Sequence, residues 1–562
     1  MTSILVLLLG YHLVRSPGFH FSKRNATLFT IIFLFQCVNI FLSFSPGRSV
    51  EAALYYFLLF ILFLALPGVF TFFQTLTLLR IMTFLAAAVS FYGLHQYFFG
   101  LEKLASIIRK TEMEIPSIFL EKLEAGRVFS TFVTPGAFAG FLLMTIPVTA
   151  FFVFLSENRK LRTLYGALLL IQTASFFLSF SIGALVALFA SALIVASLKL
   201  RRRMFIISII MIVFITAAVF FLMYRDIGFS EFWSSDSPLK LRYGNWKASI
   251  LMIGDHPVLG VGGGSYGVAF SRYREEWMNE SNYAHNSFLQ IVSENGLFAV
   301  PFLLAFLCIF FRSAWELLRR HRIRAVTSSD PSASKNNSNV ARLKGAPFLA
   351  MALLSFILHN LSDFTFYLPS VSFLFFPLCG LFFSMGAGLE EEPGDRRENA
   401  YPAGLGEYGG KRSFGKILLI LLLAVSALFF LSSFIGEISF EEAMDARESV
   451  RFEEADRLLR RAKFFNALKS DYRIYRAQLL MDEKNPSRDP MRALGEVERA
   501  IALDPFIPYY HRVASDIHLL SGDPIQAYIS ISKAASLYPA DEHYKARRDT
   551  IWTLLKGGTE KR

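Results

Sequence analysis

The feature that most constrains the fold of this chain is a series of apolar segments, each long enough to cross a membrane as a helix. A transmembrane helix needs about 20 predominantly apolar residues. Segments of this kind lie at 26–44, 51–68, 75–98, 130–155, 163–181, 182–198, 204–223, 296–316, 346–361, 367–388 and 415–435. A shorter run at 2–14 lacks the basic start and cleavage pattern of a secretory signal, and it brings the total to about 11 or 12 spans. The sequence therefore predicts an all-α, polytopic helical membrane protein.

Composition agrees with a membrane location and disfavours two other classes. Of the 562 residues 54% are hydrophobic and 60 are Phe, which is more than a soluble chain of this length could keep dissolved. The net charge of +12 comes from Lys and Arg clusters between apolar runs, which is typical of membrane topology rather than of nucleic-acid binding. Cys37, Cys308 and Cys379 lie inside apolar runs, so no disulfide framework is predicted. We expect no metal, no cofactor and no nucleic-acid partner.

Charges in the loops predict how the chain crosses the membrane, because cytoplasmic loops carry an excess of Lys and Arg. When successive spans alternate in direction, the basic clusters all fall on one side. They are Arg15/Lys23/Arg24, Arg159/Lys160/Arg162, Lys199/Arg201/Arg202/Arg203, 319–324 and Lys411/Arg412. The opposite side then holds 99–129, 224–295, 359–367 and everything after 436. We therefore expect a multi-pass protein of the cytoplasmic (inner) membrane, with loop 224–295 and the C-terminal region extracytoplasmic.

Two domains are expected. Residues 1–436 form the membrane domain, in which the cytoplasmic segments 325–345 and 389–413 are rich in Ser, Asn, Pro, Gly and charge and are interpreted as flexible linkers. From about 437 the composition changes to charged, Ala-rich helical sequence. Residues 437–562 are therefore predicted to form a separate soluble domain.

The C-terminal domain contains an internal repeat. Ala493, Ala500, Leu503 and Pro505 recur 34 residues later as Ala527, Ala534, Leu537 and Pro539, and Ala455/Ala462 lie 38 residues before the first set. This pattern resembles tetratricopeptide repeats, whose period is 34 residues and whose helix pairs stack through small side chains. The alternative is an ordinary helical bundle, which would not hold four positions in phase. The resemblance implies a helical repeat domain that could bind a protein partner.

The glycine-rich segment Gly260–Gly264 has two interpretations. A phosphate-binding loop would need the Lys-Ser/Thr that follows the glycines of a nucleotide P-loop, and this segment lacks it. The segment also lies on the predicted outer side of the membrane. A tight turn in which two backbone segments pass close together is therefore the better interpretation.

Loop 224–295 is the longest polar interval between apolar runs, and it carries the candidate catalytic residues. His285 lies beside Asn286 in a region predicted to reach water, and its unperturbed pKa of about 6.5 suits a general base. Arg242 and Arg127 are predicted on the same face. Isolated basic residues at span ends are often interfacial anchors, but two guanidinium groups beside a histidine suit bidentate phosphate binding.

Four further residues complete the candidate site. Tyr243 and Trp246 follow Arg242 closely, and aromatic side chains of this loop suit sugar stacking. His359 and Asp363 lie in a turn on the same predicted face. Asp363 could hold a histidine tautomer or a sugar hydroxyl, or it could be a solvated carboxylate at the end of a span.

These motifs together resemble the O-antigen ligase family. His285-Asn286, nine residues and Gly296 are similar to the family's His-[Asn/Ser/Gln]-x9-Gly signature, and PVLGVGGGSY with an upstream Arg resembles its large extracytoplasmic loop. GRVFSTFVTPGAFAGFL at 126–142 and HNLSDFTFYLP at 359–369 resemble further family segments. The chain departs from the pattern at Ala299 and at Ser181-Ile182-Gly183, where family members often have Ser-Arg-Gly.

The resemblance implies a metal-independent, inverting glycosyltransferase of cell-envelope polysaccharide biosynthesis, including that of lipopolysaccharide. Such an enzyme transfers a glycan from a polyprenyl-diphosphate carrier to a hydroxyl of a lipid, glycan or protein acceptor. His285 and Arg242 would be catalytic, and Arg127, Asn286, Asp363, His359, Tyr243 and Trp246 would bind substrate. A polysaccharide polymerase of the same family is the alternative. A transporter or flippase is less well supported, because it predicts ionisable residues at mid-membrane depth. The predicted spans have nearly none, and Arg80 and His95 lie near the ends of one span.

Overall fold

The computed structural model describes residues 23–69, 72–110, 125–198, 238–327, 337–387 and 414–559. Within these ranges the chain is helical and contains no strand. Each predicted span that falls in them corresponds to a helix. These are α2 (Lys23–Phe41), α3 (Pro46–Val69), α4 (Phe72–His95), α7 (Pro135–Leu155), α8 (Arg159–Leu178), α9 (Ile182–Leu198), α15 (Ala299–Thr327), α16 (Asn337–His359), α17 (Pro369–Ala387) and α18 (Phe414–Glu448). The predicted spans at 2–14 and 204–223 lie outside the described residues.

Six of the described helices are long and apolar enough to cross a membrane. Their apolar stretches are Pro46–Phe63, Gln74–Lys110, Pro135–Leu155, Arg159–Leu178, Ala299–Arg319 and Leu421–Glu448. Shorter apolar stretches occupy Thr30–Phe41, Ile182–Ser197, Lys344–His359 and Pro369–Phe383. The prediction of an all-α, polytopic membrane protein is confirmed.

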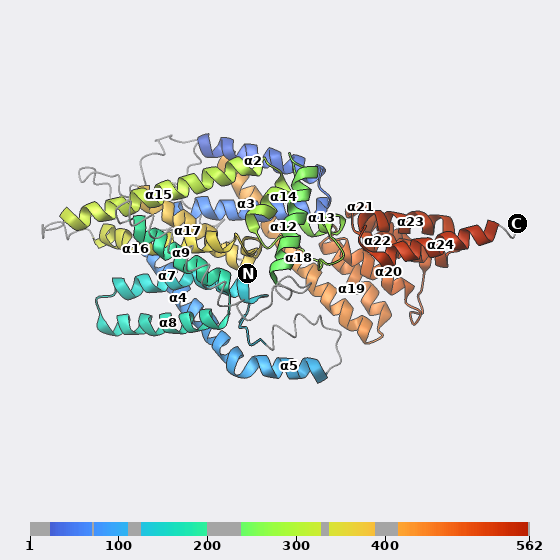
Figure 1. Ribbon diagram of the computed structural model, residues 1–562, viewed down its shortest axis with the longest axis horizontal. Coiled ribbons are helices and arrows are strands. Elements are labelled where there is room, and N and C mark those ends of the chain that lie inside the picture. Colours follow the sequence, from blue (N-terminus) through green and yellow to red (C-terminus); the bar gives the residue numbers. More distant parts are fainter. Residues whose placement is uncertain are drawn as a thin grey trace.

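Helix α7 lies at the centre of the membrane helices. Its apolar stretch is 72% buried, against 22% for α8 and 17% for α15, so α7 is packed on most sides while the other two present wide apolar faces outward. It packs against α4, α8, α9 and α16, and Figure 1 shows these helices side by side. Its N-terminus, where Thr134 caps the helix with its side chain, is thereby fixed at the end of the bundle that carries the candidate site.

Six further helices lie between the membrane helices along the described parts of the chain. They are η1 (Gln96–Gly100), α5 (Leu101–Lys110), α12 (Pro238–Asp255), α13 (Tyr266–Tyr273), α14 (Ser287–Asn295) and η3 (Thr365–Tyr367). Helices α12, α13 and α14 lie between the membrane helices and the C-terminal helices (Figure 1). A small core that includes Met252, Tyr266, Phe270 and Met278 holds α12 and α13 together, and α14 contacts both helices.

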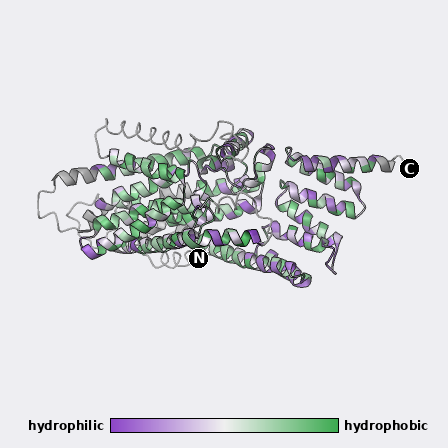
Figure 2. Ribbon diagram, turned by 60° about the horizontal axis from the view of Figure 1, so that its bottom comes forward, coloured by the Kyte–Doolittle hydropathy of each residue, from purple (hydrophilic) through white to green (hydrophobic). Residues whose placement is uncertain are grey.

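The last membrane helix continues into the C-terminal region. Helix α18 has 35 residues, about 52 Å at 1.5 Å per residue, and the boundary predicted near 437 falls inside it. Beyond that point Ala443 and Ala446 pack against Leu459 of the next helix. The helices that follow are α19 (Phe452–Phe465), α20 (Asp471–Met481), α21 (Pro490–Leu503), α22 (Pro508–Leu520), α23 (Pro524–Leu537) and α24 (Glu542–Thr559). Their most extensive contacts form three pairs, α18 with α19, α20 with α21 and α22 with α23. Figure 2 shows more hydrophilic residues in these helices than in the membrane helices.

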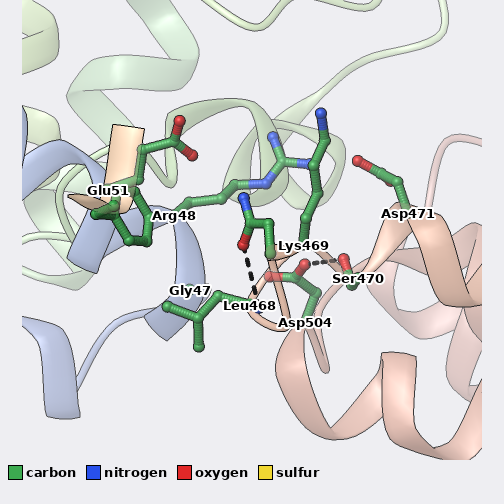
Figure 3. A pocket seen from close by; sticks show the side chains of 10 residues that line it. Gly47, Arg48, Glu51, Leu468, Lys469, Ser470, Asp471 and Asp504 are labelled. Carbon is green, nitrogen blue, oxygen red and sulfur yellow. Dashed lines mark hydrogen bonds between the residues drawn. The ribbon is translucent and has the colours of Figure 1, made fainter. Parts of the chain in front are cut away.

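The C-terminal helices dock onto the corner between α2 and α3. The Asp504 carboxylate accepts hydrogen bonds from Ser45 at this corner and from Ser470 between α19 and α20. The Phe44 and Phe506 rings stack with their centroids 4.2 Å apart. A cavity of about 300 Å³ lies at this junction between Arg48 of α3 and the turn before α20 (Figure 3). These contacts hold the C-terminal helices at the same end as α12–α14.

Candidate functional site

His285 lies at a strained turn immediately before α14. Its φ of 52° is in the left-handed region, which costs a residue with a side chain free energy and is often found at functional sites. The surrounding hydrogen bonds fix this conformation, because the Asn286 side chain caps α14 by accepting from Leu289 N at 3.1 Å and Gln290 Oε1 accepts from Ala284 N at 3.0 Å. The imidazole is half-buried and meets the Phe364 ring edge-on, with 4.8 Å between the ring centroids.

The start of α14 is tied to the turn after α16. Ser287 N donates to the carbonyl oxygens of Asn360 at 2.9 Å and Asp363 at 3.1 Å, and Ser287 Oγ donates to Asn360 Oδ1 at 2.7 Å. All three residues are buried. Two motifs more than 70 residues apart in the chain, at 285–287 and 359–363, therefore form one structural unit, as the shared predicted face suggested.

His359 and Asp363 form a buried pair at the end of α16. The His359 Nε2 atom lies 3.5 Å from Asp363 Oδ2 and 3.2 Å from the carbonyl oxygen of Gly136. A Cβ at Gly136 would overlap Asp363 Oδ2, and one at Gly140 would come within 3.4 Å of His359 Cδ2. Glycine at both positions of α7 therefore makes room for the pair. Asp363 could hold a histidine tautomer, bind a sugar hydroxyl or be a solvated carboxylate, and its position favours the first of these roles. The histidine that it contacts is His359 and not His285.

Arg127 lies in a segment held against the ends of two membrane helices. Ser130 N donates to Gln96 Oε1 at 2.8 Å. The guanidinium donates from Nε to the carbonyl of Ser179 at 3.2 Å and from Nη2 to that of Phe180 at 3.3 Å, just beyond α8, where helix carbonyls lack partners. Part of its donor capacity is thus structural. Burial lowers the pKa of Arg127, the charge of Arg242 lowers it further, and Asp363 opposes both.

Arg242 lies on α12 and faces this group. Its charge acts on both Arg127 and His359. Among the described residues, no carboxylate forms an ion pair with Arg242. Helix α12 is held in place because Ser293 Oγ donates to the Ser249 carbonyl at 3.3 Å. Two guanidinium groups that repel each other, with Asp363 as the buried carboxylate that acts on Arg127, make this end of the bundle suited to an anion.

The candidate aromatic residues are divided between two places. Tyr243 is exposed and stacks on Trp277, with 6.5 Å between the ring centroids. Trp246, one helical turn after Arg242, has a buried Nε1 without a hydrogen-bond partner in the described structure. Sequence reasoning missed Phe364, which stacks on Tyr283 at 4.3 Å and contacts His285. Its signal was its place directly after Asp363.

The glycine segment is a structural turn. Gly260, Gly262 and Gly264 have positive φ. Gly262 N donates to the Glu294 carbonyl at 2.9 Å, and Gly263 N donates to Asn39 Oδ1 at 2.9 Å, so these donors are used within the protein. The close-approach interpretation is thereby supported. Glu294, which sequence reasoning also missed, is fully buried at the end of α14, where its carboxylate accepts hydrogen bonds from backbone N–H groups of this turn.

The fold and this site define a multi-pass helical membrane protein with a cationic, histidine-containing site at one end of its helices. A family model described as O-antigen ligase matches residues 166–304. The match includes Arg242 and His285, whereas Arg127, His359 and Asp363 lie outside it. Comparisons with curated proteins and with solved structures gave no match. The match supports the resemblance to the O-antigen ligase family and a ligase-like role in glycan transfer at a membrane.

Proposed function

We propose that this protein transfers a glycan from a polyprenyl-diphosphate carrier to a hydroxyl of a lipid, glycan or protein acceptor, on the outer face of the cytoplasmic membrane. The observation that carries the proposal is that the charge of Arg242 acts on both Arg127 and His359, while the His359–Asp363 turn is bonded to the start of α14 directly after His285. Like charges repel, so such an arrangement gains most from a ligand with more than one negative charge. A diphosphate at the end of a membrane-embedded lipid meets that need.

The reaction is a displacement at the anomeric carbon of the glycan. The acceptor oxygen forms the new bond to this carbon while the bond to the diphosphate oxygen breaks, and His285 takes the proton of the acceptor hydroxyl. Negative charge develops on the departing diphosphate, where Arg242 and the remaining N–H groups of Arg127 stabilise it without a metal ion. Attack opposite the leaving group inverts the anomeric configuration.

The other predicted residues position these groups. Asn286 caps α14 and so fixes the backbone of His285. The His359–Asp363 pair connects α7, α16 and the start of α14, and the charge of Asp363 offsets part of the repulsion between the two arginines. Tyr243 is exposed beside Arg242 and Trp246 lies on the same face of α12, which suits both to contact a sugar.

We infer that the C-terminal helices form a tetratricopeptide-like repeat domain that binds a glycan or protein partner outside the membrane. The inference is supported by the three helix pairs and by the repeated alanines, because Ala493, Ala500, Ala527 and Ala534 are all fully buried. Small side chains at these positions allow neighbouring helices to approach closely.

Deleting the gene and examining surface glycans tests the function and separates ligase from polymerase. Accumulation of long chains on the lipid carrier indicates a ligase, whereas single repeat units on the final acceptor indicate a polymerase. Re-expression of the wild-type protein should restore the normal profile. The His285→Ala variant should accumulate in the membrane but should not restore the profile. An unchanged glycan profile in the deletion strain would contradict the proposal.

A further inference from the structure

The repeat domain contains a second polar cavity, on α20 and α21. It has a volume of about 300 Å³ and is lined by Arg476, Arg492, Gly495, Glu496 and Arg499. The four residues contributed by α21 are spaced three, one and three apart and so lie on one face of the helix. The cavity therefore has a polar wall and no apolar lining residue.

A buried carboxylate forms the inner end of this cavity. The Glu496 side chain is only 4% exposed, and its Oε1 accepts hydrogen bonds from Lys463 at 2.5 Å and Arg476 at 2.6 Å. Oε2 lies 3.5 Å from Nη1 of Arg473 and accepts no hydrogen bond in the described structure. The Nε of Arg473 is also buried and without a partner. A buried polar atom without a partner is costly, and it indicates a ligand or an ordered water.

The charge around Glu496 is strongly unbalanced. Lys463, Arg473 and Arg476 surround this single carboxylate, and Arg476 is shared with Asp456. On the rim, the exposed Arg492 pairs with Asp489 at 3.1 Å. Arg499 has no carboxylate partner among the residues that the structure describes. The cavity thus offers guanidinium donors to an anion and one buried carboxylate oxygen to a hydroxyl donor.

We propose that this cavity binds an acidic sugar, a ring that carries one carboxylate and several hydroxyls, within the glycan that the protein transfers. Arginine forks bind a carboxylate through two parallel hydrogen bonds, while Glu496 Oε2 accepts from a neighbouring sugar hydroxyl. An acidic peptide is the alternative source of the anion, and the experiment below includes it. The identity of the ligand as a glycan rests on the proposed function. Binding in this cavity would hold the glycan at the end of the helix bundle that carries the transfer site.

Gly495 provides a test that does not damage the fold. A Cβ built at Gly495 has no neighbouring atom within 4 Å, so a larger side chain enters the cavity and not the core. Leucine is also a better helix former than glycine. Gly495→Leu should therefore raise the midpoint of thermal unfolding while it fills the cavity, and Gly495→Ala is the matched control that adds one methyl group.

Binding is measured by titration calorimetry on the full chain in lipid nanodiscs, with trigalacturonate as the probe. We expect trigalacturonate to bind, with an affinity that weakens with added salt, and the neutral maltotriose not to bind. The affinity for trigalacturonate should fall by at least about tenfold in Gly495→Leu and in Arg499→Gln. It should stay near normal in Gly495→Ala. No binding of trigalacturonate, equal binding of triglutamate or inorganic phosphate, or unchanged affinity in Gly495→Leu overturns the proposal. His285→Gly should bind normally, so a failure of transfer and a failure of this site are distinguishable.

Discussion

Replacing His285 by glycine should separate catalysis from folding. The φ of 52° at His285 suits glycine, so the substitution relieves backbone strain on the order of 1 kcal/mol. Loss of the edge-on contact with Phe364 costs about 0.5–1.5 kcal/mol. The two effects offset, and the midpoint of thermal unfolding should stay within about 4 °C of the wild type. His285→Ala keeps the strain and loses the contact, so it should be the less stable variant.

Transfer by His285→Gly should nevertheless fall by roughly 10²–10⁴-fold, because the proton acceptor is removed. The assay follows a fluorescent glycan from a polyprenyl-diphosphate donor to its acceptor, using purified protein in nanodiscs. Added imidazole should restore part of the rate in His285→Gly, because the deleted ring leaves space beside Phe364. Transfer within about threefold of the wild type by a folded His285→Gly would refute the role of His285 as general base.

Three further predictions follow from packing, charge and topology. Gly136→Ala places a methyl group against Asp363 Oδ2. It should lower the free energy of unfolding, measured by thermal unfolding, by on the order of 1–3 kcal/mol, and it should reduce transfer. The control Gly166→Ala places its methyl group where no atom lies within 4 Å and should have neither effect. Burial raises the pKa of the Glu294 carboxyl from 4.5 to about 7. Its contribution to stability is therefore full below about pH 4.5 and is lost as pH rises through about 7, by at most roughly 3 kcal/mol, and Glu294→Gln should flatten this decline in the thermal midpoint. In a cysteine-free background, Ser281→Cys and Lys484→Cys should react with an impermeant thiol reagent in intact cells and Lys160→Cys should not; the opposite pattern would reverse the orientation.

The membrane helices could be predicted from the sequence because burial in lipid demands long apolar runs. The end of α18 could not, since its continuation to Glu448 depends on packing of Ala443 and Ala446 against α19. The residues of α18 around Ala443 and Ala446 have the composition of a soluble helix. Helix ends set by tertiary contacts leave little local signal.

The site was partly predictable for a similar reason. His285 and Arg242 are polar residues in a loop predicted to reach water, and Asn286 precedes an apolar run as helix caps do. Pairing of Asp363 with His359 instead of His285 depends on the space that Gly136 and Gly140 leave, which only the packed structure defines. Glu294 was not identified from the sequence, because its burial and its hydrogen bonds from the backbone of Gly264 and Tyr266 arise only in the packed structure.

Binding of a polyprenyl diphosphate to the protein in nanodiscs tests the central claim most directly, because it needs no acceptor. The account predicts that the diphosphate binds more tightly than the corresponding monophosphate. Arg242→Lys and Arg127→Lys keep the charge but lose the planar fork, so each should weaken binding by about tenfold or more, the equivalent of roughly 1.5–3 kcal/mol. The double variant should lose less free energy than the sum of the two, since both groups hold one ligand. Unchanged diphosphate affinity in a folded Arg242→Lys variant would contradict the account.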